Sequence, residues 1–271
     1  MTDIIAIVSD LHTNSTVGLC PPELALDDGG TYHASPGQRW LWDCWINFWD
    51  TVGDAARLNA ADVTVIFTGD LLEGDAKHRS TQLITRNVAT IMRLGAETIQ
   101  PGVVLSKRCF FLRGTPAHSG KSAQYEEALA ADTIGAVPPH AGAFSWWYWV
   151  GEIGGVVFDI MHHGPMGRLP WSKTNSMNTL AVRIMLEYAG MRVPDLAFRG
   201  HNHAWGDTFD NYPVRVIANG AWTLKSENAY RLGIVEAADI GGVIVMAEGG
   251  EYEVRKMKYK PEAEKIWTVK A

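Results

Sequence analysis

Short runs of apolar, partly β-branched residues recur along the chain, separated by polar segments and segments of helical spacing. Runs of this length, bounded by glycine and polar residues, predict buried strands. Five of them, at residues 4–8, 63–67, 109–112, 156–161 and 196–198, are each followed by residues that can bind a metal ion. Because the carboxyl ends of strands in an open parallel sheet share one edge, where ligands bind, the pattern predicts one polar, metal-binding rim.

The residues after these strands are acidic residues, histidines and one threonine. Asp10 and His12 are two positions apart, so in extended chain their side chains point the same way and can reach one ion. The later strands are followed by Asp70, by Thr115 and His118, by His162 and His163, and by His201 and His203.

Helical spacing appears between the strands. Ser35 and Pro36 are typical of an N-cap and the first helical position. Trp42, Trp45 and Trp49 follow at helical spacing, and we interpret this stripe as a helix face buried on a sheet rather than a substrate platform. Ser80 is expected to cap a helix that continues through residues 84, 88 and 91, and a later helix is predicted over residues 177–188.

The remaining segments complete the predicted organisation. Residues 144–161 have the pattern of a β-hairpin with its turn at 151–155. After residue 203, strand-like runs at 214–217, 221–224, 242–245 and 252–255 predict a second sheet packing on the first, within one domain spanning residues 1–271. The polar segment 13–37 is long for a connector, so we expect it to cover or line the site.

Composition narrows the class of protein. The chain has 271 residues, of which 46% are hydrophobic and 20% charged, as expected for a folded domain with a substantial core. The net charge of -6 offers no broad basic surface for a nucleic-acid backbone. This weighs against a nuclease, although bound cations can supply positive charge locally.

Cysteine usage and the chain's start predict the compartment. Three widely spaced cysteines indicate reduced thiols rather than a disulfide framework. The first residues enter a strand at once, without the pattern of a leader, and no apolar run is long enough to span a bilayer. We therefore expect a cytoplasmic protein without a membrane partner.

Read in order over residues 8 to 203, the motifs are Asp-x-His, Gly-Asp, Gly-Thr-x-x-His, His-His-Gly and Gly-His-x-His. This series resembles the calcineurin-like metallophosphoesterase family, whose usual motifs are Asp-x-His, Gly-Asp, Gly-Asn-His, a lone His after a strand, and Gly-His-x-His. The resemblance implies an α/β (α+β) fold, a four-layer αββα sandwich of two mixed β-sheets flanked by helices. It also implies a dinuclear metal centre.

Carried over position by position, the resemblance implies two sets of ligands that share Asp70. One ion would take Asp10, His12, Asp70 and His203. The other would take Asp70, His201 and a histidine of the 162/163 pair, with His162 preferred because it stands at the strand end. Carboxylate and imidazole ligands suit Mn, Fe, Zn or Ni better than Mg or Ca, and we expect Mn first.

The chain departs from the family pattern at one motif. In place of Gly-Asn-His it has a Gly-Thr-Pro-Ala-His sequence at residues 114–118, so an amide ligand is missing and the histidine is displaced by two positions. Thr115, His118 or water are the candidates for the missing ligand. Such Gly-Thr-x-x-His variants resemble phage-encoded members of the family. The same stretch is one residue too long for a phosphate-binding loop of the Gly-Lys-Ser type.

The reaction that the resemblance implies is hydrolysis of a phosphodiester or phosphomonoester by a metal-activated water, with a nucleic acid or nucleotide as one version of the substrate. His118 would stabilise the phosphoryl charge or protonate the leaving oxygen. Arg113 and His78 are candidate substrate contacts. Glu73 is a candidate partner that orients ligating histidines.

Two alternatives were weighed. A catalytically silent relative serving as a binding or scaffold protein would explain the lost asparagine, and it predicts weak or mononuclear metal occupancy and no turnover. A metallo-β-lactamase-like hydrolase requires His-x-His-x-Asp-His early in the chain. We exclude it because the only His-x-His, at 201 and 203, is followed by Ala-Trp-Gly-Asp.

Overall fold

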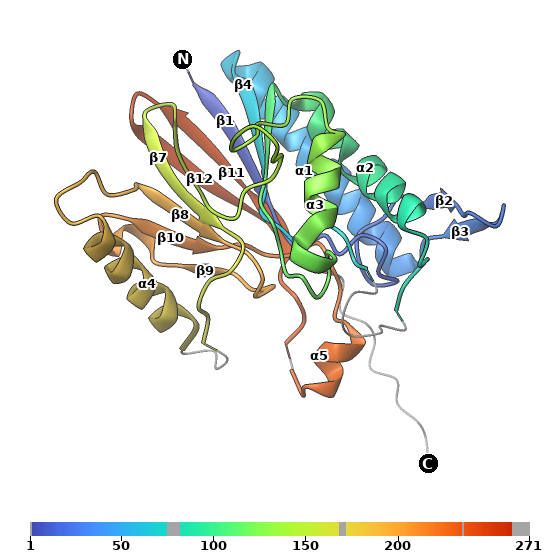
Figure 1. Cartoon of the computed structure of the whole chain (residues 1–271). Coiled ribbons are helices and arrows are strands. Elements are labelled where there is room, and N and C mark those ends of the chain that lie inside the picture. The colour runs from blue at the N-terminus through green and yellow to red at the C-terminus, as the bar shows by residue number, and fades with distance from the viewer. Residues whose placement is uncertain (1, 75–81, 168–171, 235, 262–271) are drawn as a thin grey trace.

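Two five-stranded mixed sheets face each other, and helices cover their outer faces (Figure 1). The computed structural model describes residues 2–74, 82–167, 172–234 and 236–261. The first sheet has the order β12 (Glu251–Tyr259), β11 (Ile240–Glu248), β1 (Asp3–Val8), β4 (Asp62–Phe67) and β5 (Arg108–Phe111). The second has the order β6 (Trp149–Ile153), β7 (Val156–Met161), β8 (Leu196–Arg199), β10 (Arg215–Ala218) and β9 (Gly206–Asp207).

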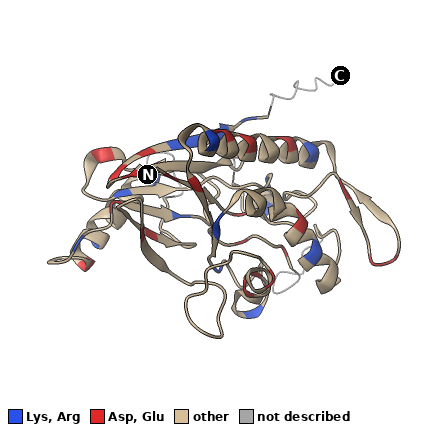
Figure 2. Ribbon diagram, turned by 90° about the horizontal axis from the view of Figure 1, so that it is seen from above, with Lys and Arg blue, Asp and Glu red and all other residues tan. Residues whose placement is uncertain are grey.

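Five helices and a small hairpin complete the described fold. The helices are α1 (Pro36–Asn59), α2 (Val88–Leu105), α3 (Gln124–Ala131), α4 (Lys173–Glu187) and α5 (Glu227–Arg231), and the hairpin is β2 (Glu23–Ala25) with β3 (Thr31–His33). No helix in the described ranges is long and apolar enough to cross a membrane. Acidic and basic residues are interspersed along the helices (Figure 2).

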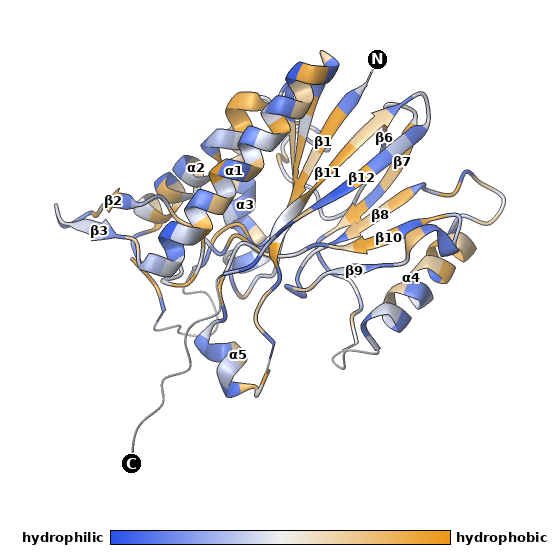
Figure 3. Ribbon diagram, turned by 180° about the vertical axis from the view of Figure 1, so that it is seen from behind, coloured by the Kyte–Doolittle hydropathy of each residue, from blue (hydrophilic) through white to orange (hydrophobic). Residues whose placement is uncertain are grey.

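Three buried apolar clusters define the layers. Because side chains alternate along a strand, Ile4 of β1 packs under α1 and α2 whereas Ile5 packs against the second sheet. The outer face of the second sheet packs on α4, with Ala181 against Val216 of β10. Hydrophobic residues accordingly concentrate along the central strands (Figure 3). The predicted fold class, a four-layer αββα sandwich, is confirmed.

The division of strands between the sheets differs from the prediction. Strands β7 and β8 belong to the second sheet, while β11 and β12 join the first, with β11 antiparallel to β1. The reason lies in the long apolar run of β11, in which Val243 and Val245 face the second sheet and Ile244 faces the helices. A strand that is buried on both faces requires a central position in a covered sheet.

Several element boundaries also differ. Residues 221–224 form isolated bridges rather than a strand, and Trp222 is a fully buried core residue. The hairpin turn is only Gly154 and Gly155, with φ of 62° and 84°, so β6 extends to Ile153. Two consecutive positive-φ residues make the tight turn that matches the twist of the flanking strands.

The first helix begins as predicted. Ser35 and Gln38 form a reciprocal capping box. The backbone N–H of Gln38 donates to Ser35 Oγ at 3.2 Å, and the backbone N–H of Ser35 donates to Gln38 Oε1 at 3.1 Å. Trp45 and Trp49 are buried in the core and Trp42 packs half-buried beside them, which confirms the helix-face interpretation.

The second helix begins later than predicted, at Val88, because Asn87 is its N-cap and its side chain accepts from the Thr90 amide at 3.2 Å. Ser80, the predicted cap, lies outside the described residues, and Ile84 precedes the helix. The 13–37 segment lines the site only at its start. Its β2–β3 hairpin lies beyond α2, where it packs on Leu94 (Figure 1).

Candidate metal centre

The carboxyl ends of β1, β4, β7 and β8 meet at one rim, although they belong to two sheets. Backbone hydrogen bonds join the turns that follow these strands. The Asp10 amide donates to the Gly69 carbonyl at 3.0 Å, the His12 amide to the Asp70 carbonyl at 3.0 Å, and the Gly200 amide to the His162 carbonyl at 2.8 Å. The single rim that the motif spacing predicts is therefore observed, but it is shared between two facing sheets.

Backbone strain concentrates at this rim. Among the described residues, ten non-glycine residues have positive φ, and five of these are candidate ligands, namely Asp10, His12, Asp70, His201 and His203. A left-handed conformation costs a residue with a side chain about 1–2 kcal/mol, and such residues persist where the surrounding structure over-determines them, often at functional sites.

Asp10, His12 and His203 form the first donor group. Nε2 of His12 lies 3.1 Å from Nε2 of His203, and Asp10 Oδ1 lies 3.2 Å from His203 Nε2 and 3.9 Å from His12 Nε2. Oδ1 is buried and has no hydrogen-bond partner among the described residues. The other oxygen of Asp10 accepts from Ser9 Oγ at 2.5 Å and from the His201 amide at 2.9 Å.

Glu73 orients the first group. Its carboxylate accepts from Nδ1 of His12 at 2.7 Å and from Nδ1 of His118 at 2.9 Å. The His118 ring stands edge-on to the His12 ring, with centroids 4.6 Å apart. A carboxylate on one imidazole nitrogen leaves the other nitrogen available to a metal ion, which is the orienting role expected of Glu73.

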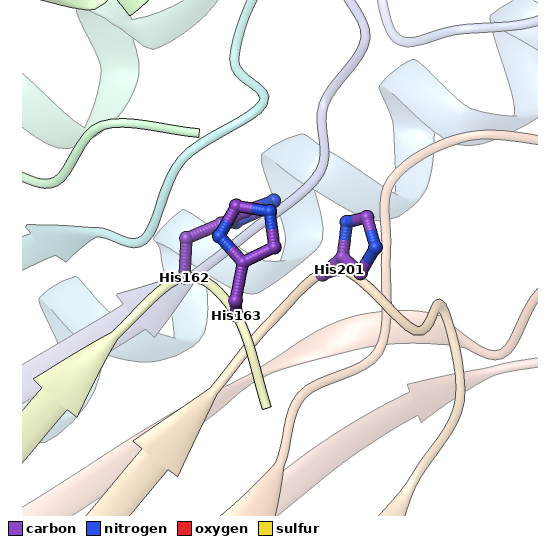
Figure 4. Close-up of side chains that lie close together, drawn as sticks. All are labelled: His162, His163 and His201. Atoms are coloured by element: carbon purple, nitrogen blue, oxygen red, sulfur yellow. The ribbon is translucent and has the colours of Figure 1, made fainter. Parts of the chain in front are cut away.

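Asp70, His162, His163 and His201 form the second donor group, and Figure 4 shows its three histidines, from two neighbouring strand ends, side by side. Nδ1 of His162 donates to the Thr68 carbonyl at 2.6 Å, which directs Nε2 to Asp70 Oδ2 at 3.0 Å. Nδ1 of His201 lies 3.9 Å from the same oxygen. Ligand atoms of Asp70, His162 and Asp10 also lie within 4.8 Å of one another, so Asp70 lies between this group and Asp10 of the first.

Thr115 occupies the position of the missing asparagine. Its amide donates to Asp70 Oδ1 at 2.5 Å. Its hydroxyl lies 3.5 Å from Nε2 of His162, 3.3 Å from Nε2 of His163 and 3.3 Å from Nδ1 of His201. The three imidazoles therefore converge on one point beside Asp70.

Electrostatics separate carboxylates that stay charged from histidines that hold protons. Burial acts to raise the pKa of Asp70, but the neighbouring His162 outweighs it and holds that pKa well below its usual range. In the same way, burial is outweighed by His203 and His162 at Asp10, whose pKa is lowered. Burial acts to lower the pKa of His162, yet the charges of Asp70 and Asp10 raise it to about 10. The pKa of His163 is lowered, by burial and by repulsion from His162 and His201.

The same balance applies to the Glu73 pair. Burial favours a higher pKa for Glu73, but hydrogen bonds from His118 and His12 lower it to about 2. Burial favours a lower pKa for His118, but its hydrogen bond to Glu73 raises it to about 9. His118 is therefore a positively charged donor near neutral pH.

The two predicted substrate contacts have different outcomes. His78 lies outside the described residues, and Arg113 does not join the donor groups. The Arg113 guanidinium donates to Ser145 Oγ at 2.8 Å, to the Ser122 carbonyl at 3.2 Å and to Glu127 Oε2 at 2.8 Å. The structure brings the other predicted residues together, and their ligand or catalytic roles stay predictions.

Sequence reasoning missed Glu126, a buried residue of α3 behind Asp70. Its carboxyl group accepts from the Leu71 amide at 3.2 Å and from the Ser119 hydroxyl. Burial, and then the charge of Asp70, raise the pKa of Glu126 to about 8. It supports both the Asp70 turn and the His118 loop. Nothing in the local pattern of α3 distinguishes Glu126 from its neighbour Glu127, so only the tertiary structure reveals it.

The donor atoms suit transition-metal ions. Each group offers carboxylate oxygen and imidazole nitrogen, the ligands that Mn, Fe, Zn and Ni accept. Oδ1 of Asp10 accepts no hydrogen bond among the described residues, and the Nε2 atoms of His12 and His203 face each other at 3.1 Å, an arrangement that a purely structural network would avoid. The residues present therefore fit metal ions at these candidate groups.

No protein-family model matches the chain, and no curated protein matches it. Similar solved structures include a single mutant of Vps29 from Entamoeba histolytica, with 13% identity and a TM-score of 0.41 over 95% of this chain and 99% of that chain. A dimetal phosphatase from Danio rerio has 8% identity and a TM-score of 0.41 over 94% and 95%. Purple acid phosphatase PPD1 from yellow lupin has 13% identity and a TM-score of 0.44 over 94% and 52%.

Proposed function

We propose that this protein is a metal-dependent phosphoesterase. The observation that carries the proposal is the pair of carboxylate–imidazole donor groups beside Asp70, in which a buried oxygen of Asp10 accepts no hydrogen bond and lies 3.2 Å from Nε2 of His203. Bound divalent ions at these positions would neutralise phosphoryl oxygens and lower the pKa of a water that attacks phosphorus. Mn, Fe, Zn and Ni are the candidates.

Asp10, His12 and His203 would hold the first ion, and Asp70 would be shared. For the second ion we assign both histidines of the 162/163 pair together with His201. The convergence of their nitrogens on Thr115 supports this assignment, because His163 supplies a donor where the family pattern has its amide. A set of three imidazoles favours Zn or Fe over Mn at this position.

His118 would act on the substrate. Held by Glu73 and carrying a proton near neutral pH, it can donate to a phosphoryl oxygen or to the leaving oxygen. Glu73 holds the rings of His12 and His118 at once, so it couples the orientation of a proposed ligand to that of the proposed acid. The displacement of the histidine by two positions is compatible with this role, because the loop carries its ring back to Glu73.

The alternative of a catalytically silent binding protein rests on the missing asparagine. His162, His163 and His201 remain around the second position, and Asp70 Oδ2 lies 3.0 Å from His162 and 3.9 Å from His201, so the substitution does not by itself leave the position short of ligands. This favours the enzyme.

The test is metal content by elemental analysis of protein purified without chelator, combined with hydrolysis of a phosphodiester after reconstitution with Mn or Zn. We expect two ions per chain and turnover, and His203→Ala should lose both the first ion and activity. His33→Ala is the matched control, because His33 is an exposed histidine on β3 that bonds only Glu23 among the described residues. Equal hydrolysis by His203→Ala and the parent would sink the assignment.

A further inference from the structure

An aromatic segment borders the candidate metal centre. Residues 144–148 carry the chain from the first sheet to the second, and three of their side chains are exposed: Phe144 by 42%, Trp147 by 53% and Tyr148 by 37%. A cleft of about 390 Å³ lies against the segment, lined by Arg113, Pro139, His140 and residues 145–148. Grouped exposed aromatic rings beside a cleft are typical of binding surfaces.

The segment is held rigidly by polar contacts. The Glu127 carboxylate accepts from the backbone amides of Phe144 and Ser145, both at 2.8 Å, and from Arg113. Nε of Arg113 donates to Ser145 Oγ at 2.8 Å, and the guanidinium carbon lies over the Trp147 ring, 5.0 Å from its centroid. Arg113 therefore supports the exposed indole from behind, and the ring is presented with little freedom to move.

Two short stretches of chain connect the indole of Trp147 to the second donor group. The Arg113 amide donates to the Trp146 carbonyl at 2.8 Å, and Arg113 precedes Thr115 by two residues. On the other side, Trp149 pairs with Ile160, which precedes His162 by two residues. Two residues of extended chain span about 7 Å, so the cleft is within reach of a group esterified to a phosphate at the centre.

We propose that this cleft binds the nucleobase of a nucleotide ester whose phosphate lies at the metal centre. The inference rests on the proposed phosphoesterase function and names its substrate class. Every nucleobase has a flat π-face that can stack on an aromatic side chain, and a fixed indole is suited to this contact. The proposal concerns the base, and it does not specify the second alcohol that is esterified to the phosphate.

The charge of the protein limits the size of this substrate. A long nucleic acid is held by lysines and arginines that follow its backbone, and this chain has a net charge of -6. The arginine that lines the cleft is already paired with Glu127. Recognition by stacking without a basic track fits a mononucleotide or dinucleotide ester rather than a duplex.

The test compares two esters with the same leaving group. Thymidine 5′-(p-nitrophenyl phosphate) and methyl p-nitrophenyl phosphate differ only in the nucleoside, so the ratio of their kcat/KM values measures the contribution of the nucleoside, and the Trp147 variants report the part that depends on stacking. We expect the parent to prefer the nucleoside ester, and Trp147→Ala to reduce the preference about tenfold. Trp147→Phe should keep most of the preference because it retains an aromatic face. Phe209→Ala, which removes an exposed aromatic ring at the far edge of the second sheet, should leave the ratio unchanged.

An unchanged ratio in Trp147→Ala, or an equal loss with both esters, would overturn the inference. The second result would mean that the cleft receives the aryl group. If the parent hydrolyses neither ester, the proposed function fails, and calorimetric titration of thymidine 5′-monophosphate into the same proteins decides the inference separately. Binding that weakens about tenfold in Trp147→Ala supports it. Equal binding, or none by the parent, rejects it.

Discussion

The two donor groups at the rim differ in exposure and in composition. In the first, Asp10 and His12 are buried, and Glu73 and Ser9 hold their remaining polar atoms. In the second, His162 is buried but the side chain of His201 is 40% exposed, and three imidazoles face one carboxylate. The first candidate position is therefore largely enclosed, whereas the second is open to solvent, which favours tighter ion binding at the first and substrate access at the second under the proposed function.

In the proposed centre both positions share Asp70, so its substitution should have the largest effect. Asp70→Asn keeps the shape but removes the charge that His162 and His201 face. We expect a loss of activity on the order of 10³-fold or more, with both ions bound more weakly. Steady-state kinetics and elemental analysis check this. Loss of the second ion alone would show that Asp70 is not shared between the two positions.

His163→Ala should separate the two positions. Because His163 contacts only the second group, we expect the second ion to bind roughly 10- to 100-fold more weakly while the first is unaffected. Calorimetric titration of metal-free protein with Zn measures both events. His33→Ala serves as the control. Two unchanged binding events would show that His163 is not a ligand and return Thr115 or water to that role.

Glu73→Gln tests the orienting role at the first position. The amide preserves size but weakens the hold on His12 and removes the charge that raises the pKa of His118. We expect kcat to fall about 10- to 100-fold, with the alkaline limb of the pH profile shifted to lower pH. A uniform fall with an unshifted profile would mean that His118 is not the acid.

The smallest expected effect is the pH dependence of the free energy of unfolding. The pKa of His162 rises on folding from 6.5 to about 10 and that of His118 from 6.5 to about 9, so their contribution to the metal-free protein is full below pH 6.5 and lost as the pH rises through these values. The pKa of Glu73 falls from 4.5 to about 2, so its contribution is present above pH 4.5 and lost as the pH falls toward 2.

Melting temperatures measured with and without metal should therefore diverge. Between pH 6.5 and 9 the metal-free protein should lose a few degrees, whereas the metal-loaded protein should gain stability because its ligands must be deprotonated. Parallel pH dependence in the two forms would contradict the assignment of His162 as a ligand.

Local sequence motifs predicted the residues of the site more accurately than they predicted which sheet each strand joins. Each proposed ligand follows its strand within a few residues, so a strand end and a motif suffice to place Asp10, Asp70 and His201 at one rim. Which sheet a strand joins depends on pairing with distant segments, and for that reason the positions of β7, β8 and β11 were predicted wrongly. For the same reason, the sequence left open which of His162 and His163 is the ligand. The cytoplasmic location and the phage-encoded subtype stay predictions.

The packing of α3 and of residues 144–148 could not be predicted from pattern alone. Glu126 is buried and Glu127 clamps the aromatic segment, yet the two are adjacent acidic residues on one short helix. Their roles follow from where the helix packs. Likewise, Arg113 was a candidate substrate contact, and its actual partners come from segments up to 32 residues away.

The most direct test is anomalous diffraction from crystals of the metal-loaded protein. The account predicts two peaks flanking the Asp70 carboxylate, one contacted by Asp10, His12 and His203 and the other by His162, His163 and His201. A single peak, or none at saturating metal, would contradict the dinuclear centre and with it the proposed phosphoesterase.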